Sequence, residues 1–465
     1  MWNEDIARDY LVAYHIYKYH EYPLVGHYAL GINFYYPPYF YYALSLLMYV
    51  STDYFFILFV FSLFNALSTV TMFFIGKLWC NEKVGLTAAM FYALSISMIY
   101  MGGSTWSAHV VVPPFLLSLL SFTIYLKSSR YLFLIVSIFI LLFISFIHLA
   151  SLPYIFLFLI LSVSLNKLTV RAAAFLCTIV SYLFLLALVP LAIHFGVKET
   201  LTAYSPSQNV QITTDIIKNF SANIETVLEV SYNFSLKEIF ISTIIITAII
   251  VYVTIRQIHK LKMLWYPLIM FLLLPALSAI KSGNTYNQFF TTSVPMLFLV
   301  YGYLMYIAFS VSRNTILRFN VFVATLALVF FSSRDMLGLQ YYTKNYIAAK
   351  AIAADIIREN NSFNFNIVAA HRGTIIWNYP AVFYFLEKTH GIKLLSVINE
   401  EISLRAINPA QTVYLICISE HTADWDVRTC SENFEKSYPD YQFAAFSKSY
   451  PSYSPYFIVS KYRKI

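Results

Sequence analysis

Long apolar stretches dominate the chain between residues 54 and 335. Ten of them have the composition of membrane-spanning helices, near residues 54–76, 84–101, 110–126, 131–148, 152–165, 172–196, 239–255, 263–280, 286–310 and 319–333. A helix needs about 20 residues to cross the hydrocarbon core of a bilayer, with a range of about 17–25. The stretch at 152–165 is short and contains Pro153, so it is the weakest of the ten. The pattern predicts a polytopic α-helical membrane protein.

The amino-acid composition agrees with this pattern. Of the 465 residues, 59% are apolar, 18% are aromatic and 12% are charged. Soluble globular domains carry about 25% charged residues, so a wholly soluble protein is excluded. The formal net charge is +8, and its excess lies in the apolar region rather than in one basic patch. The charge therefore reports membrane topology, and the sequence does not predict binding to nucleic acid.

The charged residues between the apolar stretches are distributed unevenly. Alternate connections contain one acid, Glu82, and are rich in basic residues: Lys77, Lys83, Lys127, Arg130, Lys167, Arg171, Arg256, Lys260, Lys262, Arg313 and Arg318. Cytoplasmic loops carry such an excess of lysine and arginine. The rule places the N-terminal stretch, the connection 197–237 and the C-terminal region on the extracytoplasmic side. We therefore expect an integral, multi-pass protein of the cell membrane.

Residues 1–53 form an extracytoplasmic first loop in this interpretation, ahead of a transmembrane domain at 54–335. Within the loop, residues 35–50 pass through Pro37-Pro38 and end in an apolar run too short to span a membrane. This pattern predicts an interfacial half-helix, and a plain aromatic anchor at the membrane surface is the alternative. No apolar segment precedes the loop to carry it across the membrane. We expect either a short tail that crosses unaided or, preferably, a helix upstream of Met1.

Residues 336–465 change in character and form the third predicted domain. Their patterns predict helices near 343–358 and 379–389 and strands near 364–369, 392–397 and 412–418. Alternating elements of this kind indicate a small α/β domain. Cys417 and Cys430 can form a disulfide if the domain faces an oxidising compartment, and two free thiols are the alternative.

The first loop carries the densest group of charges near an apolar region. Asp5 and Asp9 are four residues apart and share a face if the segment is helical, with Arg8 on a neighbouring side and Glu4 close by. Of two paired carboxylates, one can accept a proton from an attacking hydroxyl while the other orients a group or a divalent metal. An arginine can hold a phosphate with two hydrogen bonds. A solvated N-terminus with an Asp–Arg pair is the alternative interpretation.

Two further extracytoplasmic connections carry candidate binding residues. Trp106 and His109 precede a Pro-Pro pair, and this histidine can donate to a phosphate or a sugar hydroxyl. Lys281, Tyr286 and Asn287 supply one cation and several hydrogen-bonding groups at the mouth of a predicted helix. The alternatives are an interfacial histidine beside an anchoring tryptophan, and loop capping. The shared membrane face predicted for these connections favours a common site.

Several segments carry a family resemblance. They are Ala7-Arg8-Asp9-Tyr10-Leu11-Val12-Ala13, Pro23-Leu24-Val25-Gly26, Tyr36-Pro37-Pro38-Tyr39-Phe40-Tyr41-Tyr42, Gly76-Lys77-Leu78-Trp79, Val84-Gly85-Leu86 and the run from Trp106 to Pro113. Together they resemble glycosyltransferases of the GT-C fold that use polyprenyl-phosphate sugars. The nearest branch contains the dolichyl-phosphate-mannose protein mannosyltransferases and the lipid A aminoarabinose transferases. The resemblance covers about residues 1–333.

The resemblance implies roles for the acids of the first loop. Members of the family carry an Asp-Glu pair shortly before an arginine, and the acid deprotonates the acceptor hydroxyl. Asp5 takes that position here, with Arg8 and Asp9 following it. Ile6 stands where the second acid is common, and Glu4 is the substitute the sequence offers. Either Asp5 or Asp9 is therefore the expected base, and inversion at the anomeric carbon is implied.

The expected function is transfer of a monosaccharide from a polyprenyl-phosphate carrier to a protein, lipid or glycan acceptor at the outer face of the membrane. Arg8, His109 or Lys281 would offset charge on the departing phosphate, and the aromatic segment around Tyr36 would guide the lipid. No cofactor is predicted, and a divalent metal is left open. The alternatives are a lipid or sugar transporter and a non-catalytic relative that binds a glycan or lipid. A transporter is expected to have charged or broken helices at mid-membrane depth, whereas these apolar stretches contain essentially no Asp, Glu, Lys or Arg and show no break in the sequence pattern.

Overall fold

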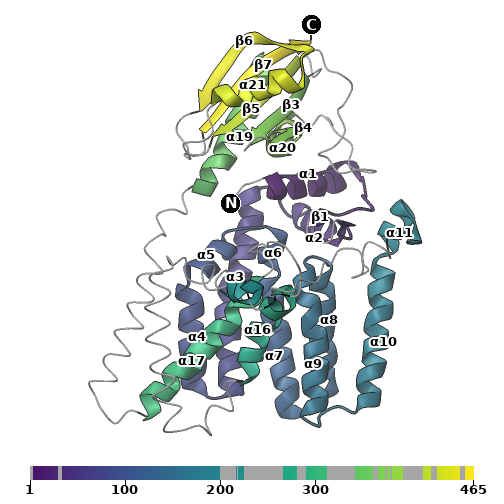
Figure 1. Cartoon of the computed structure of the whole chain (residues 1–465), viewed down its shortest axis with the longest axis vertical. Coiled ribbons are helices and arrows are strands. Elements are labelled where there is room, and N and C mark those ends of the chain that lie inside the picture. Colours follow the sequence, from purple (N-terminus) through teal and green to yellow (C-terminus); the bar gives the residue numbers. More distant parts are fainter. Residues whose placement is uncertain are drawn as a thin grey trace. The chain divides into compact units, whose positions relative to one another are not determined.

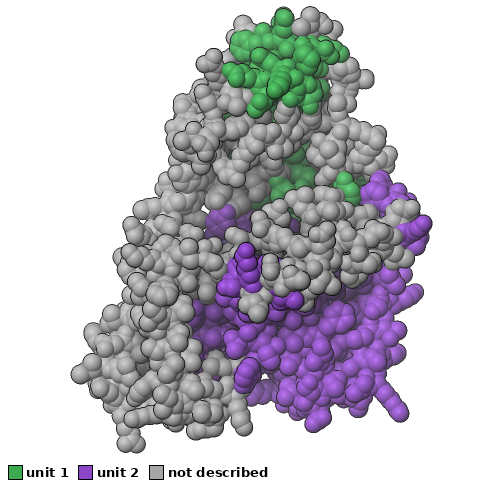
Figure 2. Space-filling model, in the orientation of Figure 1, with its two compact units in different colours: residues 1–29, 35–54, 338–465 green, residues 30–34, 55–337 purple. Residues whose placement is uncertain are grey.

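The structure of the protein, a computed structural model, describes residues 4–29, 34–198, 200, 216, 218–224, 265–279, 290–311, 341–359, 365–371, 374–377, 380–390, 412–419, 427–450 and 456–464. The chain divides into two compact units (Figure 2). Unit 1 consists of residues 1–29, 35–54 and 338–465, and unit 2 consists of residues 30–34 and 55–337. The boundaries lie close to those expected from the sequence. The first and third domains expected from the sequence fall together in unit 1.

The helices of unit 1 come from both ends of the chain (Figure 1). They are α1 (Glu4–Tyr19), α2 (Tyr39–Met48), α19 (Tyr341–Glu359), α20 (Pro380–His390) and α21 (Val427–Ser437). The helices predicted at 343–358 and 379–389 are confirmed as α19 and α20. The sequence did not predict α21.

The helix predicted within residues 35–50 is confirmed as α2. It begins directly after Pro38, whose ring fixes a backbone angle compatible with a helical start. One face of α2 is buried, and it consists of Phe40, Tyr41, Leu44, Ser45 and Met48. Leu46, by contrast, is 68% exposed. The helix therefore presents apolar side chains on two sides. Two short strands precede it, β1 (Tyr28–Ala29) and β2 (Phe34–Tyr35), and they pair with each other.

A five-stranded mixed sheet forms the rest of the described part of unit 1. Its strands are β3 (Phe365–His371), β4 (Thr374–Trp377), β5 (Thr412–Ser419), β6 (Tyr441–Tyr450) and β7 (Tyr456–Lys464), in the order β4-β3-β5-β7-β6. β3 and β5 are parallel, and the other neighbours are antiparallel. The strands predicted at 364–369 and 412–418 are confirmed as β3 and β5. The strand predicted at 392–397 lies outside the described residues.

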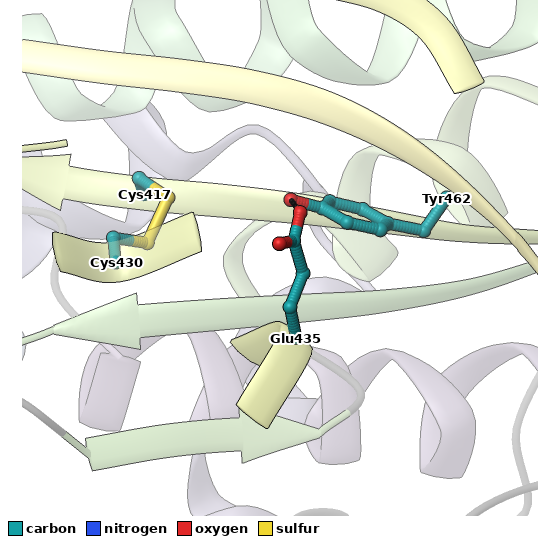
Figure 3. Close-up of a disulfide and its surroundings, with 4 residues drawn as sticks. All are labelled: Cys417, Cys430, Glu435 and Tyr462. Atoms are coloured by element: carbon teal, nitrogen blue, oxygen red, sulfur yellow. Dashed lines mark hydrogen bonds between the residues drawn. A yellow bond between two sulfur atoms is a disulfide. The ribbon is translucent and has the colours of Figure 1, made fainter. Parts of the chain in front are cut away.

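The central strand β5 anchors the core of the sheet. Its alternate residues Val413, Leu415 and Cys417 point to one face, where they pack with Val368, Cys430, Phe434, Tyr441 and Tyr462. Cys417 and Cys430 form a disulfide that joins β5 to α21, so the pairing considered from the sequence is confirmed (Figure 3). Near it, the hydroxyl of Tyr462 donates to Glu435 at 3.2 Å. These contacts hold α21 against the sheet.

Unit 2 is helical throughout its described part. Its helices are α3 (Tyr54–Trp79, whose first residue belongs to unit 1), α4 (Glu82–Leu94), α5 (Ile96–Gly102), α6 (Ser107–Val110), α7 (Val112–Ser128), α8 (Tyr131–Ser145), η1 (Leu149–Ser151), α9 (Leu152–Ser164), α10 (Val170–Ala187), α11 (Val189–Phe195), α16 (Trp265–Ala279) and α17 (Val294–Val311). Two predicted helices are broken in the structure. The stretch 84–101 is interrupted at Ser95, which has an extended backbone, and the stretch 172–196 is interrupted at Leu188, ahead of Pro190. The stretches 239–255 and 319–333 lie outside the described residues.

Three helical segments in the described part of the chain are long and apolar enough to cross a membrane. They are Tyr54–Trp79, Ser107–Ser128 and Val170–Ala187. Shorter apolar helices occupy Tyr131–Ser145, Leu149–Ser164, Trp265–Ala279 and Val294–Ile307. On α3, Phe59 and Phe64 are 62% and 54% exposed, which is typical of a surface that contacts lipid. These helices support association with a membrane, and the ten spans stay a prediction.

Close helix packing in unit 2 depends on small residues. A Cβ atom on Gly76 of α3 would lie 2.7 Å from the Cα atom of Gly85 of α4. A Cβ atom on Gly85 would collide with the carbonyl oxygen of Phe73 and lie 2.9 Å from the backbone nitrogen of Lys77. Small residues allow two helices in a membrane to approach at backbone distance. The loop between α3 and α4 is therefore held by direct backbone contact.

Candidate functional site

The helix α1 brings the acidic group of the first loop together. The Nη1 atom of Arg8 lies 2.8 Å from Oδ1 of Asp5, and its Nη2 atom lies 2.9 Å from Oδ1 of Asp9. The Nε atom of Arg8 also donates to Oδ1 of Asp9, at 3.1 Å. Asp5 lies three positions before Arg8, so the two are neighbours on the helix surface, and Asp9 directly follows Arg8 in the sequence. One guanidinium therefore bridges both carboxylates. Glu4 begins the same helix.

Burial on nearly all sides distinguishes α1 from an ordinary surface helix. Ala7, Tyr10, Leu11 and Tyr14 repeat at helical spacing and are 5% exposed or less. Val12, Ala13 and Ile16, on the other sides of the helix, are also buried. A polar side chain on an enclosed side of this helix is shielded from water as well. The packing of α1 therefore decides the environment of its carboxylates.

Asp9 is the enclosed member of the group. Its side chain is 1% exposed, and its Oδ2 atom has no hydrogen-bond partner among the described residues. Burial raises the pKa of Asp9 to about 7, the positive charge of Arg8 lowers it, and the nearby carboxylate of Asp5 raises it further. A carboxyl group that titrates near neutral pH, with one oxygen free of hydrogen bonds, is suited to accept a proton.

Asp5 occupies a different environment on the same helix. Its side chain is 45% exposed, and Arg8 lies at hydrogen-bond distance. The sequence left open whether Asp5 or Asp9 is the base. Burial, and an Oδ2 atom with no hydrogen-bond partner among the described residues, distinguish Asp9 from Asp5.

Tyr36 lies inside a tight local structure in unit 1. Its ring is 4% exposed and stacks on the imidazole of His27, with 4.4 Å between the ring centroids. Its backbone N–H donates to the carbonyl of His27, and its own carbonyl accepts from Gly26. A Cβ atom on Gly26 would lie 2.6 Å from that carbonyl oxygen, so the turn requires glycine there. The contacts of Tyr36 thus give it a structural role in this turn.

Trp106 and His109 belong to unit 2, at the start of the segment Ser107–Ser128, which is long and apolar enough to cross a membrane. His109 is 7% exposed, and its Nδ1 atom has no hydrogen-bond partner within the described part of the chain. The rings of Trp106 and Tyr100 contact its imidazole, with centroid distances of 5.1 Å and 5.8 Å. The pair predicted from the sequence is therefore in direct contact. The other predicted binding residues, Lys281, Tyr286 and Asn287, lie outside the described residues.

A buried group of ionisable residues in unit 1 is not predicted by any local sequence pattern. His15 is fully buried between Glu21 and Glu387, which are 4% and 0% exposed. The Nδ1 atom of His15 lies 2.8 Å from Oε2 of Glu21, and its Nε2 atom lies 2.5 Å from Oε2 of Glu387. No sequence signal connects residues 15 and 387, because only the folded chain brings them together. In the regions that the structure describes, no group of three or more His, Cys, Asp or Glu side chains is arranged to hold a metal ion.

Two comparisons with known proteins found no relative of this chain. No protein-family model matches the chain, and no curated protein matches it either. The likeness to GT-C glycosyltransferases therefore rests on the short segments of sequence described above, and the site rests on its own geometry.

Proposed function

We propose that the protein is a membrane glycosyltransferase that moves a monosaccharide from a polyprenyl-phosphate carrier to an acceptor hydroxyl, with Asp9 as the general base. The observation that carries the proposal is the state of the Asp9 carboxyl group. It is buried, its Oδ2 atom has no hydrogen-bond partner in the described part of the chain, and its pKa is about 7. A general base is most effective when its pKa lies near the working pH.

The proposed reaction is a single displacement. The acceptor hydroxyl donates a hydrogen bond to Oδ2 of Asp9 and loses its proton to that oxygen as it attacks the anomeric carbon. The new bond joins the anomeric carbon to the acceptor oxygen. The bond between the anomeric carbon and the phosphate oxygen breaks, and the polyprenyl phosphate leaves with the electron pair. Proton abstraction by a positioned base contributes about 10²–10⁴-fold to such a rate.

Arg8 orients the proposed base. Its Nη2 and Nε atoms both donate to Oδ1 of Asp9, and this fixes the carboxyl group with Oδ2 turned away. Its Nη1 atom donates to Asp5, so the guanidinium is held from both sides. Arg8 therefore acts on the proposed base by fixing its orientation.

The proposal places unit 1 at the outer face of the membrane. The disulfide between Cys417 and Cys430 supports this placement, because disulfides persist in oxidising compartments outside the cytosol. The basic connections on the opposite side agree with it. Ten spans and a GT-C arrangement of the helices are part of the proposal.

The distribution of ionisable residues in the described spans favours a transferase over an ion-coupled transporter. In the three described spans the Asp, Glu, Lys and Arg residues lie near the ends: Lys77 near the end of Tyr54–Trp79, Lys127 near the end of Ser107–Ser128 and Arg171 near the beginning of Val170–Ala187. Ion-coupled transporters place such groups near the middle of the membrane. A non-catalytic protein that binds a lipid-linked sugar is the remaining alternative.

The proposal is tested by turnover of defined donors. Purified full-length protein in detergent is incubated with radiolabelled mannose, glucose or aminoarabinose linked to undecaprenyl or dolichyl phosphate. Acceptors are a serine- and threonine-rich peptide and a lipid A extract. We expect transfer from at least one donor, an Asp9→Asn rate reduced by at least about 100-fold and an Asp5→Asn rate within about tenfold of the wild type.

The matched pair of variants makes the test specific. Both substitutions remove one negative charge that contacts Arg8, and they differ in the burial of the residue. An Asp9→Asn protein that turns over as fast as the wild type would refute the mechanism. Donor binding without turnover of any donor would identify the non-catalytic alternative.

A further inference from the structure

The buried group of His15, Glu21 and Glu387 joins distant parts of the chain. His15 lies on α1 and Glu387 lies on α20, 372 positions later. Both nitrogens of the imidazole face carboxylate oxygens, at 2.8 Å and 2.5 Å. When both carboxylates are ionised, only the imidazolium form donates a hydrogen bond to each. Buried polar groups are tolerated in an apolar interior when they are hydrogen-bonded, as these three side chains are.

Neighbouring contacts between α1 and α20 are aromatic. The ring of Tyr384 on α20 meets those of Tyr10 and Tyr14 edge to face, with centroid distances of 6.0 Å and 6.1 Å. Such contacts stabilise the pairing of two helices but tolerate small shifts along their axes. Hydrogen bonds at the His15 group are directional, so they determine the register of α1 on α20.

A second attachment ties α20 to the segment that leads into α3. The hydroxyl of Tyr384 donates to the carbonyl oxygen of Thr52 at 3.0 Å, and Nζ of Lys388 donates to the same oxygen at 2.7 Å. The helix α20 is therefore fixed to the N-terminal part of the chain at both α1 and Thr52. It is therefore a fixed element against which α1 packs.

We propose that His15, Glu21 and Glu387 are positioning residues for Asp9, and that the C-terminal part of unit 1 thereby controls the reactivity of the first loop. This inference rests on the proposed function. Asp9 and His15 are six residues apart on one helix, which is about 9 Å along its axis. A shift of α1 by one ångström moves the carboxyl group by the same amount. Misplacement of a catalytic group by about 1 Å can reduce a rate by about 10²-fold.

The test compares Glu387→Gln with Glu435→Gln. Glu387→Gln keeps the shape of the side chain and removes one charge from the His15 group. Glu435→Gln is the matched control, because Glu435 also accepts a hydrogen bond in unit 1, from Tyr462, and lies on α21 rather than on α20. Amide hydrogen exchange of residues 4–19 is measured in both full-length variants. Donor turnover is measured with mannosyl-phosphoryl-undecaprenol and with whichever donor the wild type uses.

We expect Glu387→Gln to increase amide exchange in α1 at least tenfold, while β5 and β7 keep wild-type exchange. We also expect kcat to fall at least tenfold with KM within threefold, and Glu387→Asp to recover part of the loss. Glu435→Gln should change neither readout. If Glu387→Gln does not fold, Glu21→Gln carries the test, with the same effects expected on α1 and on kcat.

Two results would overturn the inference. The first is wild-type exchange of α1 in the Glu387→Gln and Glu21→Gln proteins, which would show that the group does not hold the helix. The second is increased exchange of α1 with an unchanged kcat, which would show that its placement does not matter to catalysis. Hydrogen exchange does not depend on activity. A wild-type protein that turns over no donor would therefore refute the proposed function and leave the exchange result to decide whether the group holds α1.

Discussion

At the scale of single residues, Asp5 and Asp9 show how burial changes the chemistry of one side-chain type. Both carboxylates contact Arg8, but Asp5 is 45% exposed and Asp9 is 1% exposed. Water stabilises the ionised form of an exposed carboxyl group, and a buried one loses that stabilisation. The Asp9 carboxyl group consequently keeps its proton up to a pH of about 7. Arg8 limits this effect, since its positive charge favours the ionised form.

The pKa of Asp9 predicts the pH dependence of the proposed reaction. The base is active when ionised, so the rate should rise through pH 7 and level off above it. Below the pKa, each unit of pH lowers the ionised fraction about tenfold, and the initial rate should follow. The measurement is the initial rate of donor turnover between pH 5 and pH 9. A rate that is constant from pH 5 to pH 7 would contradict the assignment of Asp9 as base.

The sequence predicted the grouping of Asp5, Arg8 and Asp9 because helical spacing alone brings them together. It did not predict which acid is buried. The residues that enclose α1 include those of α20, more than 360 positions away, and no local pattern reports them. The pairing of His15 was not predicted for the same reason, since its partner Glu387 lies on α20.

At the scale of elements, hydrophobic length predicted where helices lie better than where they end. The stretch at 84–101 reads as continuous, yet Ser95 takes an extended backbone and divides it into α4 and α5. The strands β6 and β7 were missed because lysine, serine and tyrosine interrupt their apolar positions. Their partners lie in β5 and in each other, so pairing across the sheet stabilises them rather than local propensity.

Contact between α3 and α4 predicts the effect of adding one methyl group. Gly85→Ala would place its Cβ atom against the backbone of Phe73 and Lys77, which cannot move without separating the helices. Overpacking of this kind costs about 1–3 kcal/mol. We expect the melting temperature in detergent to fall by at least about 3 °C. Gly103→Ala is the control, since its Cβ atom would have contacts no closer than 3.5 Å, and an equal fall in both variants would contradict the prediction.

Removal of the disulfide is expected to lower the stability of unit 1 alone. Cys417 and Cys430 are 13 positions apart, and closing a loop of this size stabilises a fold by about 3 kcal/mol. Replacing both by serine should increase amide exchange in β5 and α21 and leave α7 unchanged. The control replaces the free cysteines Cys80 and Cys177 by serine. Wild-type exchange of β5 in the variant without the disulfide would show that the bond does not stabilise the sheet.

At the scale of the whole molecule, segments from the two ends of the chain belong to one compact unit. Residues 1–29 and 35–54 share unit 1 with residues 338–465, although the long helical unit 2 separates them in sequence. The sequence predicted the polar character of both end segments and the apolar character of the middle. It did not predict that the two ends belong to one unit. The contacts between α1 and α20 are made by side chains such as Tyr10 and Tyr384, and each segment's own sequence pattern gives no sign of its partner.

The placement of unit 1 outside the cell is the claim on which the proposed function depends most directly. It is tested with single cysteines in a protein that carries Cys80→Ser and Cys177→Ser, labelled in intact cells by a maleimide that does not cross membranes. Asp5→Cys and Gln442→Cys report on exposed positions of unit 1, and Arg130→Cys reports on a basic connection. We predict labelling at positions 5 and 442 in intact cells, and at position 130 only after permeabilisation. Labelling of position 130 in intact cells, with positions 5 and 442 protected until permeabilisation, would contradict the account.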